Sequence, residues 1–122
     1  VSADPREIDP QTHRDWFAAS LAMPTRRLWI GQVGPRPVGV LRFDFDAAAA
    51  RVSIFLDPAL TGLGLGTPLL ACGEARLRRE QPALRRLEAE VLADNRASQQ
   101  LFRRAGYTGD GRLLTKPLDA TP

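Results

Sequence analysis

The 122-residue sequence is poor in the side chains that form covalent or metal cross-links. It contains one cysteine, Cys72, and one histidine, His13. A single cysteine excludes an internal disulfide framework, and one cysteine with one histidine makes a Cys/His zinc site implausible. We therefore expect no metal, and because unpaired thiols suit a reducing compartment we expect a cytoplasmic protein.

Long apolar runs are also missing. No stretch approaches the roughly 18–20 apolar residues that a membrane span needs, and no signal peptide pattern opens the chain. We therefore expect no membrane partner. Because the first residue is Val1 and not Met, we expect a processed chain, a fragment or the tail of a longer polypeptide.

Lysine is almost absent from a chain that is otherwise basic. The formal net charge is +3, and Lys116 is the single lysine among 17 basic residues. A nucleic-acid site would require an uninterrupted basic patch with aromatic residues between, whereas the arginine clusters here are scattered. We therefore expect no nucleic-acid partner. An arginine excess also suits a small anionic ligand such as phosphate, which guanidinium binds bidentately.

The remaining composition is that of a globular domain. Hydrophobic residues make up 43% and charged residues 25% of the chain, which excludes disordered and low-complexity classes. A chain of this length buries roughly two thirds of its unfolded surface, so it can form a core. With no internal repeat and no linker, residues 1–122 are assigned to one domain.

The hydrophobic pattern predicts helices and strands in a mixed order. Asp9 and Pro10 fit the first positions of a helix over 10–21, in which Phe17 and Leu21 lie one turn apart. The further expected elements are strands at 28–33, 38–43 and 52–56 with a polar linker over 44–50, a helix between Gly66 and Pro82, a strand at 87–92, a helix over 95–105 and a last strand at Leu113 and Leu114. This order predicts an α/β (α+β) fold with a mixed sheet and helices on both faces.

A glycine run, Gly62-Leu63-Gly64-Leu65-Gly66, lies between a predicted strand and a predicted helix. The first amides of a helix have no intrahelical partner, its dipole adds roughly half a positive charge there, and glycines let a phosphate approach. A Walker loop would need a lysine where Thr67-Pro68 stands, and a Rossmann fingerprint has a different glycine spacing. The run favours an anion site, with a plain glycine-rich turn as the alternative.

A second informative stretch runs from Val91 to Tyr107. Asn95 follows a strand, so its side chain can close its own turn or cap the next helix, and that structural role is the alternative to a functional one. Ser98 lies in the first turn of the same helix, where a plain surface residue is the alternative.

Together the two stretches resemble the GNAT superfamily of acetyl-CoA-dependent N-acetyltransferases, over roughly residues 28–107. Residues 61–66 resemble its Arg/Gln-x-x-Gly-x-Gly/Ala pattern, and residues 95–107 resemble its Asn-x-x-Ser/Ala-x-x-Leu-Tyr/Phe-x-x-x-Gly-Phe/Tyr block. The resemblance implies a mostly antiparallel sheet whose first strand is truncated, and acetyl-CoA as co-substrate.

The resemblance also implies roles for single residues. The amides of residues 63–67 would hold the CoA pyrophosphate, the backbone of Leu56 would pair with pantetheine, and Asn95 with Ser98 would lie against pantetheine or the acetyl end. Phe102 stands where many members carry the tyrosine that protonates the leaving thiolate, which leaves that role to Tyr107 or water. The implied cofactor-binding set is Leu56, Leu63, Gly64, Leu65, Gly66, Thr67, Asn95, Ser98 and Phe102.

The implied chemistry is direct attack of an amine on the thioester, without a covalent enzyme intermediate. Backbone N–H groups near Leu56 would stabilise the oxyanion, and a carboxylate or ordered waters would take the amine proton. Glu90 and Asp44 are the candidate bases, each with an ion pair to arginine as the alternative. Asn95 completes the candidate catalytic set.

The expected acceptor is a small-molecule amine. His13, Trp16 and Phe17, followed by Leu21, look like a subgroup that acetylates amino groups on nucleotide-linked amino sugars. Protein N-termini, polyamines and aminoglycosides stay open as acceptors, and so does a homodimer. The alternative to an enzyme is a catalytically silent acetyl-CoA-binding regulatory module.

Overall fold

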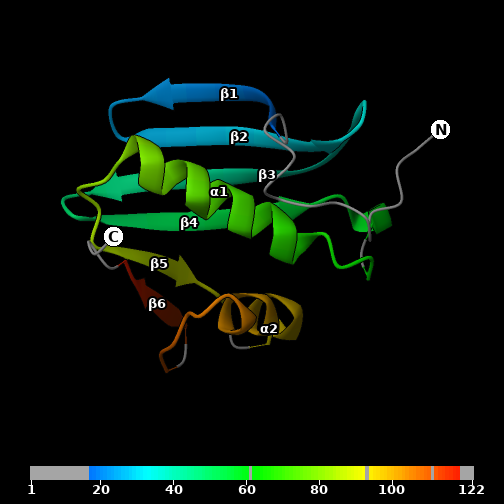
Figure 1. The fold of residues 1–122 in the computed structure, drawn as a ribbon. Helices are drawn as coiled ribbons and strands as arrows, with labels where there is room; N and C mark the ends of the chain where they lie inside the picture. Colours follow the sequence, from blue (N-terminus) through cyan, green and yellow to red (C-terminus); the bar gives the residue numbers. More distant parts are fainter. Residues whose placement is uncertain (1–16, 61, 93, 111, 119–122) are drawn as a thin grey trace.

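The computed structural model describes residues 17–60, 62–92, 94–110 and 112–118 (Figure 1). These residues form strands, two α-helices and the short 3-10 helix η2 (Pro58–Leu60). The elements are β1 (Phe17–Met23), β2 (Arg26–Val33), β3 (Arg36–Asp46), β4 (Ala49–Leu56), α1 (Gly66–Glu80), β5 (Arg86–Glu90), α2 (Arg96–Arg104) and β6 (Leu113–Pro117).

The strands form one six-stranded mixed sheet in the sequential order β1 to β6. Strands β1 to β4 are antiparallel neighbours, β5 is parallel to β4, and β6 is antiparallel to β5. Helix α1 makes the crossover that a parallel pair requires. The expected mixed, mostly antiparallel sheet is confirmed.

The parallel β4–β5 ladder is the shortest in the sheet. It joins residues 49–51 to residues 86–88, whereas β3 and β4 stay paired along the whole of β4. Residues 52–56 of β4 therefore have no partner strand on their β5 side. Because unpaired backbone N–H and C=O groups bind strongly to any available partner, this edge can pair with a ligand.

The core lies between α1 and one face of the sheet, and Figure 1 shows α1 lying across the strands. Trp29, Leu41 and Ile54 are aligned across β2, β3 and β4, and Trp29 and Leu41 are fully buried. Gly73 of α1 approaches Leu41 so closely that no Cβ fits there. Burial of each large apolar side chain contributes roughly 1.5–3 kcal/mol, so this layer is the main source of stability.

The opposite face of the sheet carries a row of alternating charges. Arg26, Asp44, Arg51 and Glu88 are aligned across β2 to β5. Ion pairs join Arg26 to Asp44 at 2.6 Å and Arg51 to Glu88 at 3.2 Å, and a hydrogen bond from Arg86, followed by one from Arg51, lowers the pKa of Glu88. Each such cross-strand pair is worth only roughly 0.2–1 kcal/mol, so the row mainly favours this register over others.

A buried carboxylate connects α1 to the C-terminal part of the sheet. Glu74 of α1 is 7% exposed, and its two oxygens accept hydrogen bonds from Tyr107 Oη at 2.8 Å and from Lys116 Nζ at 2.7 Å. An unpaired charge at this depth would be costly, so both donors are needed to keep the carboxylate there. The contacts hold the segment after α2 and strand β6 against α1.

Two expectations about the elements are wrong. Residues 17–21 lie in β1 and not in the helix expected over 10–21, of which residues 10–16 lie outside the described residues. Phe17 pairs with Gly31 and Leu21 with Leu28, with a register shift between Phe17 and Ala19, so pairing with β2 and not the four-residue spacing decides the element. The stretch 44–50 is no linker, because β3 and β4 extend into it and are joined at Ala47, whose φ is 54°.

Tyr107 is the only tyrosine of the chain, so phenolate absorbance reports on it alone. Burial, and then the neighbouring Glu74 carboxylate, raise the pKa of Tyr107 far above its usual value of 10.0. Since the folded-state pKa is raised, the stabilisation is complete below about pH 10 and is lost as the pH rises further. We expect the phenolate absorbance to rise only at the pH at which the chain unfolds. Circular dichroism, recorded on the same samples, measures that unfolding.

The same chain in urea is the control for this titration, and its tyrosine should ionise near the usual pKa. A folded chain that shows phenolate near pH 10 would contradict the buried Tyr107–Glu74 hydrogen bond.

Candidate functional site

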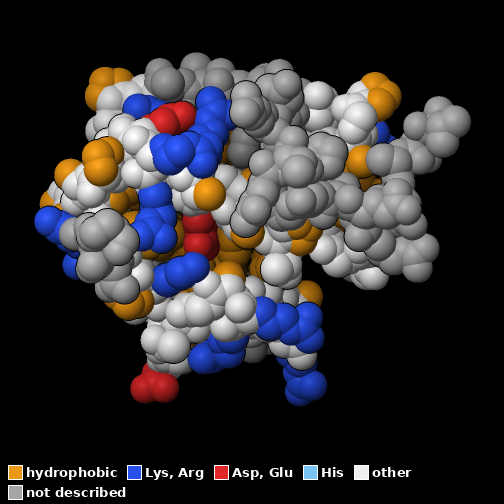
Figure 2. Space-filling view, viewed as in Figure 1, with side chains coloured by type: hydrophobic (Ala, Val, Ile, Leu, Met, Phe, Trp, Pro, Cys, Tyr) orange, Lys and Arg blue, Asp and Glu red, His pale blue; other side chains and the backbone are white. Residues whose placement is uncertain are grey.

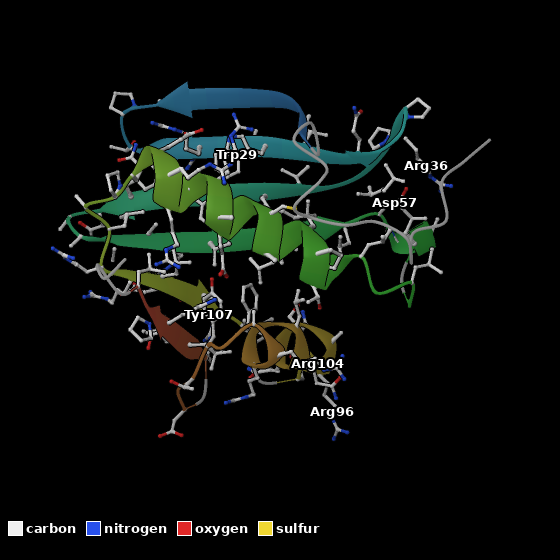
Figure 3. The ribbon with its side chains drawn as sticks, viewed as in Figure 1. Trp29, Arg36, Asp57, Arg96, Arg104 and Tyr107 are labelled. Carbon is white, nitrogen blue, oxygen red and sulfur yellow. The ribbon has the colours of Figure 1, made fainter. Side chains whose placement is uncertain are left out.

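A cleft of about 570 Å³ lies beside the second half of β4, where β4 is no longer paired with β5. Its walls are the second half of β4, the glycine loop after η2, the first turn of α1 and one face of α2. The site therefore forms at the carboxyl end of a parallel strand, where an α/β sheet commonly binds ligands. Figure 3 shows α2 beside the start of α1, with Arg96 and Arg104 labelled on it.

The glycine loop has a backbone that only glycine adopts easily. Gly62 has a φ of +88° and Gly64 a φ of +73°, and a Cβ at either position would meet nothing within 4 Å. These glycines are needed for conformation, and they leave the space before α1 open. Gly66 has another role, because its Cβ would lie 3.2 Å from Leu56 and 3.3 Å from Leu101. The missing side chain at Gly66 lets the start of α1 pack closely against Leu56 of β4 and Leu101 of α2.

The first turn of α1 is suited to an anion. No side chain caps its start at Leu65, and the turn contains no acidic residue. The free N–H groups and the helix dipole therefore offer hydrogen bonds and positive potential to the cleft. The amide of Leu63 already donates to the carbonyl of Leu60 at 3.3 Å, so the available amides are those of residues 64–67.

Helix α2 forms the facing wall, and Asn95 caps it. The Asn95 Oδ1 accepts a hydrogen bond from the Ser98 amide at 3.1 Å. Ala97, Leu101 and Arg104 follow along the side that lines the cleft. Their spacing of three to four residues is that of one helix face.

All but two of the expected cofactor-binding residues line this cleft. Leu63 is 46% exposed and lies outside its walls, and Phe102 is 3% exposed and stacks edge-to-face on Tyr107 with ring centroids 5.0 Å apart. Those that line it are Leu56, Gly64, Leu65, Gly66, Thr67, Asn95 and Ser98.

The expected catalytic residues are not brought together. Asp44 lies in the charge row with Arg26 and Arg42 as ion-pair partners, the second at 3.1 Å. Glu90 ends β5, and its side chain is 56% exposed, 3.7 Å from Arg51. Strand alternation puts Glu90 on the face opposite the buried Ala89, beside the point where β4 and β5 separate.

Tyr107, one of the two expected sources of a thiolate proton, is not in the cleft. Its side chain is fully buried and its hydroxyl donates to Glu74. The sequence reasoning also missed residues that line the cleft, and Arg104 is the one with a charge. Its position seven residues after Ala97 and three after Leu101, on the same helix face, is the signal that could have identified it.

Within 17–60, 62–92, 94–110 and 112–118, no cluster of three His, Cys, Asp or Glu residues could hold a metal ion. In the same ranges, no helix has both the length and the apolar character needed to cross a membrane.

The sequence matches the model of the acetyltransferase (GNAT) family over residues 2–107. The match covers most of the chain and includes the glycine loop and both helices that line the cleft. The chain belongs to this family.

Solved structures agree on the fold. The GNAT domain of S. lividans PAT is 28% identical, with a TM-score of 0.66 over 88% of this chain and 65% of that one. An acetyltransferase from Salmonella typhimurium that modifies the N-terminal serine of a ribosomal protein is 20% identical, with a TM-score of 0.68 over 79% and 66%. Spermidine N-acetyltransferase from Vibrio cholerae, with CoA and spermine bound, is 12% identical, with a TM-score of 0.68 over 77% and 66%. The chain thus spans slightly less than two thirds of each.

Asn95 both caps α2 and lines the cleft, so its replacement should affect stability and activity separately. Replacing Asn95 by Ala should lower the free energy of unfolding by about 1 kcal/mol, because the cap is lost, while Asn95→Ser should keep the cap and most of the stability. We expect turnover to fall in both variants, and in Asn95→Ala by more than the loss of stability explains. Denaturant unfolding and thiol-release rates on the same preparations measure the two effects. Full activity in Asn95→Ser would show that capping is the only role.

Proposed function

We propose that this chain is an acetyl-CoA-dependent N-acetyltransferase that moves the acetyl group directly to a primary amine. The observation that supports this best is the cleft, which joins the uncapped start of α1 to the unpaired half of β4. One end suits a diphosphate and the other suits an extended arm that contains amides. CoA has these two parts in this order.

The phosphates are proposed to bind at the glycine loop. The amides of residues 64–67 would donate to the phosphate oxygens, and the open space at Gly62 and Gly64 lets them approach. No acidic residue stands in the first turn of α1 to repel them.

The pantetheine arm is proposed to run along residues 52–56 of β4. An extended segment of this length spans about 13 Å from its first to its last residue. Pairing with its backbone would continue the sheet in place of β5 and direct the thioester toward the point where the two strands separate. Ile54 and Leu56 supply apolar wall on the same side.

Transfer then needs an oxyanion donor and a route for one proton. The expected donors near Leu56 lie at the phosphate end of this path, about 13 Å from the strand opening. The proposed donors to the thioester oxygen are therefore the backbone N–H groups of β4 beside that opening, as the amine nitrogen bonds to the carbonyl carbon. The C–S bond then breaks. Glu90 is the proposed acceptor of the amine proton, directly or through water, because it is exposed beside the strand opening. Asp44, which has two arginine partners, is the weaker candidate.

The leaving thiolate takes its proton from water in this scheme. Phe102 has no proton to give, and the Tyr107 hydroxyl is held by Glu74. The same two facts favour the second candidate function, a module that binds acetyl-CoA without turnover. The proposed acceptor is a primary amine. Nucleotide-linked amino sugars and protein N-termini are the two candidate classes of acceptor.

The test is thiol release from acetyl-CoA with a panel of amines, from neutral to about pH 9. The panel contains spermidine, a peptide with a free N-terminus and a nucleotide-linked amino sugar. We expect one thiol for each acetylated amine with at least one acceptor class. Binding of acetyl-CoA with no release on any amine would support the silent module, and absence of binding would overturn both functions.

Gly64→Glu should weaken acetyl-CoA binding at least tenfold, measured by calorimetry, because a carboxylate in the loop repels the phosphates. The variant also pays a conformational penalty of roughly 1–2 kcal/mol for its positive φ. Gly34→Glu is the matched control, since Gly34 has a φ of +57°, open space around its Cβ and no place in the cleft. Both variants should lose similar stability, and only Gly64→Glu should lose affinity. Equal affinity in the two would count against the site.

A further inference from the structure

We infer that Arg104 is the side chain that binds a phosphate group of the cofactor, an inference that rests on the proposed function. Arg104 closes α2 and lines the cleft. It is the one charged side chain among the described residues of the cleft wall. A lone guanidinium beside an uncapped helix start makes that end of the cleft positive.

The glycine loop supplies no cation of its own. Residues 58–67 contain neither lysine nor arginine, with Thr61 at the start of the glycine run. Backbone amides therefore provide hydrogen bonds there but no formal charge. A ligand with several negative charges needs a cation from another element, and α2 is the element that faces the loop across the cleft.

The position of Arg104 brings it near the start of α1. Leu101, one turn earlier in α2, has both its methyl carbons 3.3 Å from where a Gly66 Cβ would lie. Arg104 is three residues further, or about 4.5 Å along the helix axis. A long arginine side chain at that distance can reach a phosphate held by the first turn of α1. Figure 3 labels Arg104 on α2, and Arg104 lines the same cleft as Gly66 and Thr67 of that turn.

Arg104 is also free to take a ligand. No hydrogen bond or ion pair joins it to another residue in the described ranges. Its neighbour Arg103 donates to the Gly109 carbonyl at 3.1 Å, and Arg26 and Arg51 pair with carboxylates. Figure 2 shows such basic side chains in several separate places on the visible face. Arg104 is distinguished by its cleft position and by five donors without a described acceptor.

The experiment compares Arg104→Gln with Arg103→Gln, which removes the same charge from the next position outside the cleft. Dissociation constants for CoA are measured by calorimetry on both variants and on the unaltered chain. We expect Arg104→Gln to bind CoA roughly five- to tenfold more weakly, because the pair is charge-assisted yet screened by solvent. Arg103→Gln should bind like the unaltered chain, and Arg104→Lys should recover part of the loss.

A second ligand, 3′-dephospho-CoA, identifies which phosphate is bound. If the effect of Arg104→Gln disappears with this ligand, the partner is the 3′-phosphate, and if it persists, the partner is the diphosphate. Either result supports the inference. Equal CoA affinity in Arg104→Gln and Arg103→Gln overturns it and leaves the proposed function standing, whereas an unaltered chain that does not bind CoA overturns the proposed function itself.

Discussion

The early end of the β4–β5 ladder is the constraint on which the site depends. Three residues of each strand pair, and after Arg51 the edge of β4 has no β5 neighbour. If that edge were closed by a full-length β5, neither the cleft nor the free backbone groups would exist. The proposed chemistry depends on this gap, so the proposed binding site is built mainly from backbone and only secondarily from side chains.

Charge is divided between the two sides of the sheet. On the open face the carboxylates Asp44, Glu88 and Glu90 all have arginine partners, which balances the face. On the α1 side the described cleft wall has Arg104 as its single charged residue. A polyanion is thereby favoured on the α1 side, whereas the carboxylates of the other face are already balanced by arginines.

Local signals account for what the sequence could predict. The glycine run marked the loop because Gly62 and Gly64 need positive φ, and Asn95 marked the start of α2 because it caps that helix. Long-range pairing accounts for what it could not. The register that ends the β4–β5 ladder, and the bond from Tyr107 to Glu74 across 33 residues, leave no periodic trace in the sequence. The prediction of a helix for 17–21 is wrong because the four-residue spacing of Phe17 and Leu21 resembles one face of a helix, whereas pairing with β2 makes the segment a strand.

The ion pair of Lys116 with Glu74 has a chemical consequence for a chain that is proposed to bind a reactive thioester. Thioesters acylate accessible uncharged amines spontaneously, whereas guanidinium groups stay charged and are not nucleophilic. Every basic residue except Lys116 is arginine, and the Lys116 ammonium is engaged by a buried carboxylate. The molecule thus has positive charge with almost no lysine that the proposed co-substrate could acylate.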